Sequence, residues 1–226
     1  MSSSGEQCQA TQSCYIPTLI EGNLVRNVRG YDYGGEGIYT DENVAGVYIT
    51  GNGVGNVSGA ALYLHCGLNQ SVINNIFWGA KQPSGPHFSG GGPALMGTCN
   101  TGGVEPQWTN VSALLQNNVF ELTVGGSQLF DSGQTLGAEV FQSNVYWVTP
   151  TAGTPQGLRW LGNASTAPMR TWQEWQAGGQ DAQGAVADPL IANPALSDFT
   201  LLPGSPALAL GFQQLFPSGP PGPRRM

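Results

Sequence analysis

The sequence predicts an all-β protein in which short strands stack as successive coils of a parallel β-helix. A composition rich in turn-forming residues and a repeat built on asparagine are the two observations that predict it. Of the 226 residues, 34 are Gly and 16 are Pro, and only 9% are charged. This composition favours frequent turns over long helices. The length allows one large all-β domain or two small ones.

The repeat consists of Gly, Asn or Ser, followed by Asn, a variable residue and an apolar residue. Its five asparagines are Asn23, Asn52, Asn75, Asn118 and Asn144, at intervals of 29, 23, 43 and 26 residues. Three of these intervals match one coil of a parallel β-helix, and a short alternating strand precedes most of the asparagines. Leucine-rich repeats have a similar period, but their LxxLxL pattern is missing. We predict that the asparagines stack as a ladder and tolerate the left-handed backbone of tight turns.

The remaining segments complete a single predicted domain over residues 16–212. The long interval is explained by an inserted loop at about 79–107, which is rich in Gly and Pro. A short helix is predicted at about 171–177, because TWQEWQAGG contains a TxxE capping box and ends in Gly. Extended edge strands after it finish the stack. Residues 1–15 are predicted to be flexible, and residues 213–226 to be a disordered tail.

The charge of the chain restricts its partners. The net charge is −7, so no basic surface is expected to gather the phosphates of a nucleic acid. The same sign disfavours polyanionic glycans, and a neutral polysaccharide or oligosaccharide fits better. No apolar run reaches the roughly 18 residues of a membrane helix, and the first residues lack the features of a signal peptide. We expect a monomer without a membrane partner.

The cysteines and histidines do not predict a metal centre or a cofactor. Four Cys allow three pairings, of which Cys8 with Cys14 would close a small loop, while Cys66 and Cys99 flank the insertion. Whether any disulfide forms stays open, because the compartment decides it. A zinc site at His65, Cys66, His87 and Cys99 would lack the usual paired spacing. A calcium site at Asp41, Glu42 and Asn43 would likewise lack a recognised ligand pattern.

A candidate site follows from two segments with the same internal spacing. Ile38, Tyr39 and Asp41 match Leu62, Tyr63 and His65 at a constant offset of 24 residues. If these segments are neighbouring strands about 4.8 Å apart, Asp41 and His65 point outward together.

Counting residues back from the ladder asparagines places further side chains on the same outward wall. Trp108 precedes Asn118 by the ten residues that separate His65 from Asn75, which predicts an indole one coil further along. Asp131 takes a similar outward position before Asn144. Glu42, Tyr39 and Tyr63 complete the predicted substrate-binding set, and the inserted loop would form a rim.

Several motifs resemble right-handed parallel β-helix repeat proteins of the pectate-lyase-like superfamily. They are GIYTDE, the HxG motif at His65, NNIF, and DPLI followed by DFTLLPGSPALALGF. The resemblance covers residues 16–212 and implies about five to six coils. It also implies further coils ahead of this region, so the chain looks like the C-terminal part of a longer protein. Many such proteins act on carbohydrates, and an extracellular location is expected if a longer form carries a signal peptide.

The resemblance also implies roles for the site. In β-helix glycosidases the Asp of a GIxLD motif is the nucleophile, and Asp41 of GIYTD matches it. Their acid/base is a Glu on the next coil, where this sequence has His65. A His stacked over a carboxylate has its charged form favoured and can act as a general acid. We therefore predict a hydrolase acting on a neutral polysaccharide, with Asp41 as nucleophile or base and His65 as proton donor.

Other interpretations of these residues stay open. Asp41 and Glu42 can be a solvated turn, His65 a surface imidazole, and Trp108 a cover over apolar surface. The chain would then be a non-catalytic glycan-binding or structural β-helix. A polysaccharide lyase or epimerase is a further alternative, although no Lys or Arg lies on the matched strands.

Overall fold

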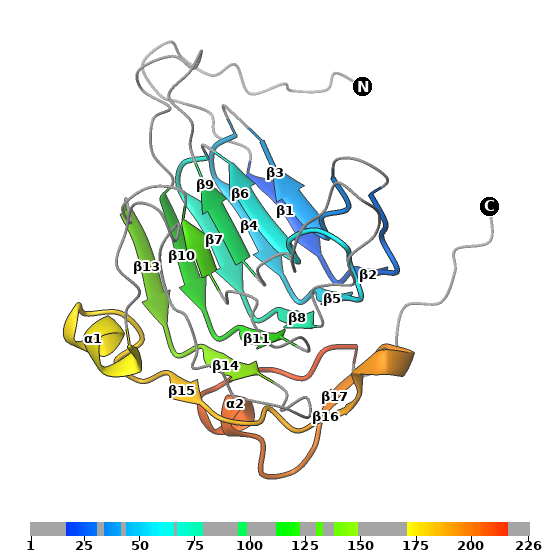
Figure 1. Ribbon diagram of the computed structural model, residues 1–226, viewed down its shortest axis with the longest axis vertical. Coiled ribbons are helices and arrows are strands. Elements are labelled where there is room, and N and C mark those ends of the chain that lie inside the picture. The colour runs from blue at the N-terminus through cyan, green and yellow to red at the C-terminus, as the bar shows by residue number, and fades with distance from the viewer. Residues whose placement is uncertain are drawn as a thin grey trace, which may run out of the picture.

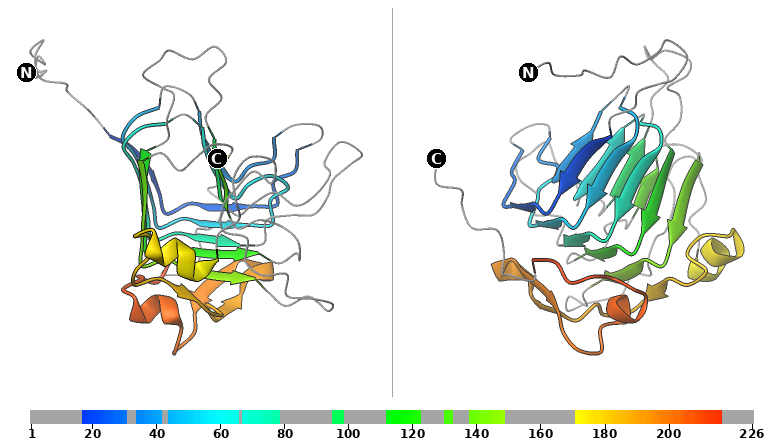
Figure 2. Two further views of the ribbon diagram at one scale, coloured as in Figure 1. Left: turned by 60° about the vertical axis from the view of Figure 1, so that its left-hand side comes forward. Right: turned by 180° about the vertical axis from the view of Figure 1, so that it is seen from behind.

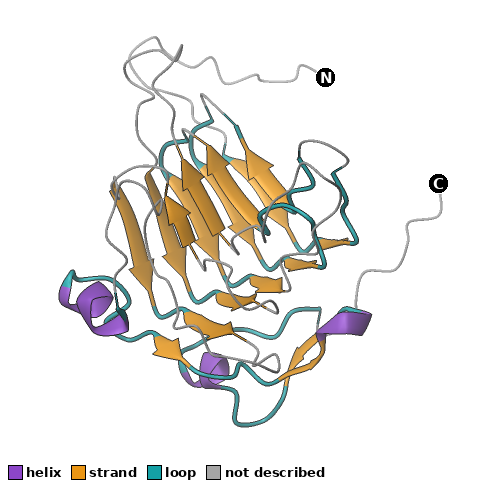
Figure 3. Cartoon of the chain, viewed as in Figure 1, coloured by secondary structure: helices purple, strands orange, loops and turns teal. Residues whose placement is uncertain are grey.

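The computed structural model of the chain describes residues 17–30, 34–41, 44–65, 67–78, 95–98, 112–122, 130–132, 138–148 and 171–216. These residues are mostly in strands, in agreement with the predicted all-β class. Figure 3 shows that the helices are confined to the C-terminal part. None of the helices in the described ranges has the length and apolar character needed to cross a membrane.

Strands β1 to β15 are distributed over three parallel sheets, and from β1 to β14 every third strand along the chain returns to the same sheet (Figure 1). The first sheet has the order β1 (Thr18–Glu21), β4 (Val47–Thr50), β7 (Gln70–Ile73), β10 (Ser112–Gln116), β13 (Ala138–Gln142). The second has the order β15 (Ala185–Val186), β14 (Val145–Val148), β11 (Val119–Leu122), β8 (Ile76–Trp78), β5 (Gly53–Gly55), β2 (Leu24–Arg26). The third has the order β12 (Phe130–Ser132), β9 (Leu95–Thr98), β6 (Leu62–His65), β3 (Ile38–Thr40). The colours advance in chain order across the strands of these sheets (Figure 2).

The core is built from inward side chains that stack in register from coil to coil. On the first sheet, Ile49 pairs with Val72, and both are completely buried. On the second sheet, the ring of Phe120 stacks between those of Phe77 and Tyr146, with centroid distances of 5.2 and 5.5 Å. Offset or stacked aromatic pairs of this kind add to the gain from apolar burial.

The recurring asparagines form the predicted ladder. In each link, the side-chain oxygen of one Asn accepts two hydrogen bonds from the Asn of the preceding coil. Asn75 Oδ1 accepts from the backbone N–H and from Nδ2 of Asn52, both at 2.9 Å. Asn75 Nδ2 in turn donates to Asn118 Oδ1 at 2.9 Å and to the Ile49 carbonyl at 2.9 Å. The completely buried members are Asn52, Asn75, Asn118 and Asn144.

The left-handed turn position is not the one that was predicted. The ladder asparagines themselves are not left-handed, and the residue before each of them is. Those residues, with their φ values, are Gly22 (64°), Gly51 (65°), Asn74 (59°), Asn117 (52°) and Ser143 (55°). This explains why the first position of the repeat is Gly, Asn or Ser, since bulky or β-branched side chains are strained there.

A buried aspartate ends the ladder at its C-terminal end. Asp181 Oδ1 accepts from the backbone N–H of Asn144 at 3.0 Å and from its Nδ2 at 2.9 Å. The other oxygen accepts from the Tyr146 hydroxyl at 2.6 Å and from Trp175 Nε1 at 3.1 Å. Burial raises the pKa of the Asp181 carboxyl, while the hydrogen bonds from Tyr146, Asn144 and Trp175 oppose the rise. Burial also raises the pKa of Tyr146, which therefore keeps its proton.

The helix that carries Trp175 was predicted from its capping residues. Helix α1 spans Trp172–Ala177, and the Thr171 side chain accepts from the Glu174 backbone N–H while Glu174 bonds back to the Thr171 N–H. Trp175 is buried and packs edge-on against Phe141 at a centroid distance of 4.9 Å. The helix therefore covers the end of the core.

The C-terminal segment covers the outer face of the second sheet. It contains β16 (Ile191–Asn193), a 3-10 turn (Pro194–Leu196), β17 (Asp198–Leu201) and α2 (Pro206–Ala209). Strands β16 and β17 pair with each other in antiparallel fashion rather than extending a parallel sheet, so only β15 continues the stack. Phe199 approaches β5 so closely that a β-carbon at Gly53 would lie 2.7 Å from its ring. This contact requires glycine.

Two predicted boundaries are corrected by these elements. Residues 213–216 belong to the packed structure instead of the predicted tail, because Leu215 is buried. The Gln214 side-chain amide also accepts a hydrogen bond from the Leu201 backbone N–H and donates one to the Leu201 carbonyl. Strand β9 lies inside the predicted inserted loop and pairs with β6 along its whole length. The loop was predicted because the segment is rich in Gly and Pro, and this composition gave no sign of the strand within it.

Replacing a central ladder residue should destabilise the fold strongly. Asn75→Ala removes an acceptor from Asn52 and a donor to Asn118, leaving buried polar groups without partners. We expect the free energy of unfolding to fall by about 3 kcal/mol, against less than about 1 kcal/mol for Asn23→Ala at the exposed end of the ladder. Urea titration of both variants measures the difference, and equal losses would contradict a ladder that stabilises through burial.

The aspartate at the end of the ladder should make stability depend on pH in a defined direction. Because its folded-state pKa is raised above the ordinary value of 3.8, the folded protein holds a proton that the unfolded chain has released. The stability of the wild type relative to Asp181→Asn should therefore fall as pH rises from 3.8 through the raised pKa. Urea titrations from acidic to neutral pH test this, and a relative stability that rises over the same range would contradict it.

Candidate functional site

The third sheet places Asp41 and His65 side by side, as their common offset predicted. Ile38 pairs with Leu62 and Tyr39 with Tyr63 in parallel register between β3 and β6. One residue beyond β3, the Asp41 carboxylate meets the His65 ring, with 2.9 Å between Oδ1 and Nδ1. The chain between the two strands makes one coil, so residues 24 positions apart become neighbours.

Alternation along the two strands directs these groups outward. On β3, Ile38 and Thr40 are buried, whereas Tyr39 is 39% exposed. On β6, Leu62 and Leu64 are buried, so the outward positions again carry the aromatic and polar side chains. The buried set anchors the strands, and the alternate set forms a wall that solvent reaches.

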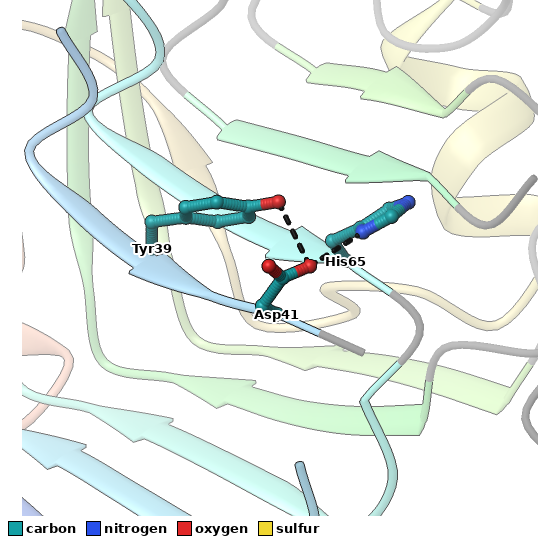
Figure 4. Close-up of polar contacts among 3 residues, drawn as sticks. All are labelled: Tyr39, Asp41 and His65. Atoms are coloured by element: carbon teal, nitrogen blue, oxygen red, sulfur yellow. Dashed lines mark hydrogen bonds and ion pairs between the residues drawn. The ribbon is translucent and has the colours of Figure 1, made fainter. Parts of the chain in front are cut away.

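The two tyrosines of this wall stack on each other. Tyr39 and Tyr63 have ring centroids 4.8 Å apart and an angle of 16° between their planes. The Tyr39 hydroxyl also donates to Asp41 Oδ1 at 2.9 Å (Figure 4). The His65 ring lies 5.6 Å from the ring of Tyr63. The four side chains form one connected group, which we call the Tyr-Asp-His cluster (Tyr39, Tyr63, Asp41 and His65).

The hydrogen bonds of the cluster orient the imidazole. Oδ1 of the Asp41 carboxylate accepts from both Tyr39 and His65, because an ionised carboxylate has no proton to give. A neutral His65 must therefore carry its proton on Nδ1, which leaves Nε2 able to accept one. The His65 side chain is 13% exposed, while that of Asp41 is 64% exposed. The arrangement is that of a proton-transfer group held by a carboxylate.

The structure corrects the register that was predicted for Trp108. His65 pairs with Thr98 of β9, so the position one coil further along belongs to Thr98. Trp108 lies outside the described residues. The prediction for Trp108 counted ten residues back from Asn118, as between His65 and Asn75. The connection from β9 to β10 is longer than the one from β6 to β7, so ten residues do not reach back to β9.

The remaining predicted residues are placed only in part. Asp131 pairs with Met96, which pairs with Tyr63, so its backbone stands at the register position of the tyrosines and not of His65. Glu42 lies outside the described residues, as do Asn43, His87 and the four cysteines. Within the described ranges, no group of three or more His, Cys, Asp or Glu side chains is arranged to hold a metal ion.

The sequence did not predict the bond between Tyr39 and Asp41. Both residues were assigned to the wall, but Tyr39 was expected only to contact substrate. The available signal was their spacing of two residues, which places them on the same face of an extended strand. The same spacing brings Tyr63 and His65 together on β6.

Comparison of the chain with family models, curated proteins and solved structures found no match.

The protonation of His65 tests the geometry of the cluster. Nitrogen-15 NMR of the neutral imidazole should find the proton on Nδ1 in the wild type, because Asp41 accepts it there. In Asp41→Asn the side-chain amide can donate or accept, so the preference for Nδ1 should weaken. Stability should change by less than about 1 kcal/mol, since an exposed pair contributes little. A wild-type proton on Nε2 would contradict the observed contact.

Proposed function

We propose that the chain is a right-handed parallel β-helix. The return of every third strand to the same parallel sheet supports this. The asparagine ladder adds support, because it joins the same turn of consecutive coils. In a β-helix the outward face of one sheet is a continuous wall, on which side chains from successive coils line up across the strands.

We infer that the protein is carbohydrate-active and hydrolyses glycosidic bonds in a neutral polysaccharide. The observation that carries this is the 2.9 Å contact between Asp41 and His65 on an outward wall, next to two stacked tyrosines. The cluster supplies a proton-transfer group, an anionic group and amphipathic rings. The net charge of −7 favours an uncharged substrate. An extracellular location and a monomeric state belong to the same proposal.

The contacts favour His65 as the general base rather than as the predicted proton donor, because its Nε2 is able to accept a proton. Its Nε2 takes a proton from water while the water oxygen attacks the anomeric carbon, and Asp41 stabilises the imidazolium that forms. A general acid must protonate the leaving oxygen as the glycosidic bond breaks. Asp41 as the nucleophile is less favoured, since Oδ1 already accepts two hydrogen bonds.

Non-catalytic glycan binding is the second candidate, and the tyrosines favour it. Tyr39 is 39% exposed at the edge strand of the sheet, and its ring stacks on Tyr63. An amphipathic ring of this kind can contact the apolar face of a sugar without any chemistry. In that case, removing Tyr39 would weaken binding, and removing His65 would change little.

A screen of neutral polysaccharides for release of reducing ends tests the hydrolase proposal. On any substrate that is cleaved, His65→Gln should lower kcat by roughly 100-fold or more, the usual contribution of general acid–base catalysis. Asp41→Asn should also lower kcat and alter its pH profile. Glu21→Gln is the matched control, because it removes an exposed carboxylate from β1 on a different sheet.

Two outcomes would contradict the proposal. One is full activity in His65→Gln, which would separate the cluster from the chemistry. The other is binding of an oligosaccharide without cleavage by the folded wild type, which would favour the glycan-binding candidate. Thermal unfolding of each variant shows whether any loss of activity reflects loss of the fold.

A further inference from the structure

Among the described residues, nothing continues the asparagine ladder beyond its N-terminal end at Asn23. Asn23 donates its backbone N–H to Asn52 Oδ1 at 2.9 Å and its Nδ2 to the same oxygen at 3.0 Å. Its own Oδ1 accepts no hydrogen bond from the described residues. Each later ladder Asn uses this oxygen to accept a pair of bonds from the coil before it. Asn23 therefore presents an acceptor of the kind that a preceding coil would fill.

The apolar side chains at this end are also incompletely covered. Ile20 and Val25 point toward the core and pack against it, yet they are only half-buried. Their counterparts one coil later, Ile49 and Val54, are completely buried. The three strands that form this end, β1, β2 and β3, each lie at the edge of a sheet. Open edges of this kind readily accept a further strand.

The opposite end of the stack is closed. Asn144 gives both its backbone N–H and its Nδ2 to Asp181, and Trp175 of α1 covers the carboxylate. A second copy of the chain therefore has no free pair of donors with which to continue the ladder from that end. The occupant of the open end must bring such a pair itself.

We propose that the end formed by β1, β2, β3 and Asn23 is a docking face for one further β-coil. The occupant is a polypeptide segment that runs parallel to β1 and carries an asparagine after a left-handed Gly, Asn or Ser. Its backbone N–H and Nδ2 donate to Asn23 Oδ1, and its apolar side chains cover Ile20 and Val25. Such a segment would continue the ladder, because the same contact between neighbouring asparagines recurs from Asn23 to Asn144. The proposal does not depend on the hydrolase activity.

The coil Val47–Asn69 of this chain serves as the probe. A copy inserted between Pro17 and Thr18 of the full chain enters in register, because Val47 already pairs with Thr18. Hydrogen exchange of the Thr18–Glu21 amides should slow by roughly tenfold or more, and the unfolding temperature should rise. Changing the inserted copy's Asn52→Ala keeps the strands but removes the side-chain donor. This control should dock less well and give a smaller shift of both readouts.

Three results would overturn the proposal. The first is unchanged exchange at Thr18–Glu21 with the inserted coil, including a variant that fails to fold around it. The second is equal protection with and without the inserted asparagine, which would leave edge pairing but remove the ladder from the recognition. The third is that the Thr18–Glu21 amides of the unmodified chain are protected from exchange only while the chain is a dimer, and lose this protection when dilution dissociates it. A second copy would then be the occupant.

Discussion

The fold depends on one interaction, the double hydrogen bond that each ladder asparagine gives to the next. It fixes the register of consecutive coils, because the backbone N–H and Nδ2 of one Asn reach the same oxygen. A shift by one residue would lose both bonds and expose the inward side chains. Buried amides are costly without partners, so the ladder imposes one register and penalises the others. The left-handed residue before each Asn turns the chain so that the amide points inward.

The candidate site depends on this register, because the register aligns the strands that carry the site. Once the coils are aligned, residues separated by a whole coil become cross-strand neighbours, and outward positions gather side chains from different parts of the sequence. Asp41 and His65 meet in this way, and Tyr39 and Tyr63 stack for the same reason. The cluster can therefore be altered with little effect on stability, because its members contribute only to the outer surface.

Sequence reasoning succeeded where coils have similar lengths and failed where they do not. The match of residues 38–41 with 62–65 needed no gap, and the structure confirms that residues 38–40 pair with 62–64 and that the Asp41 and His65 side chains meet. Trp108 was misplaced because β9 is hidden within a segment rich in Gly and Pro, and counting back through it loses the register. The ladder itself was recognised from its repeated Asn. Asp181 was missed because a carboxylate replaces the amide at the last position, after a segment in which the repeat is no longer visible.

Through-hydrogen-bond NMR couplings between side-chain amides test the central claim most directly. The account predicts couplings from Nδ2 of each ladder asparagine to the side-chain carbonyl carbon of the next, in the order Asn23, Asn52, Asn75, Asn118, Asn144 and Asp181. Couplings that are absent, or that link these residues in another order, would contradict the stacking of coils and remove the physical basis of the site.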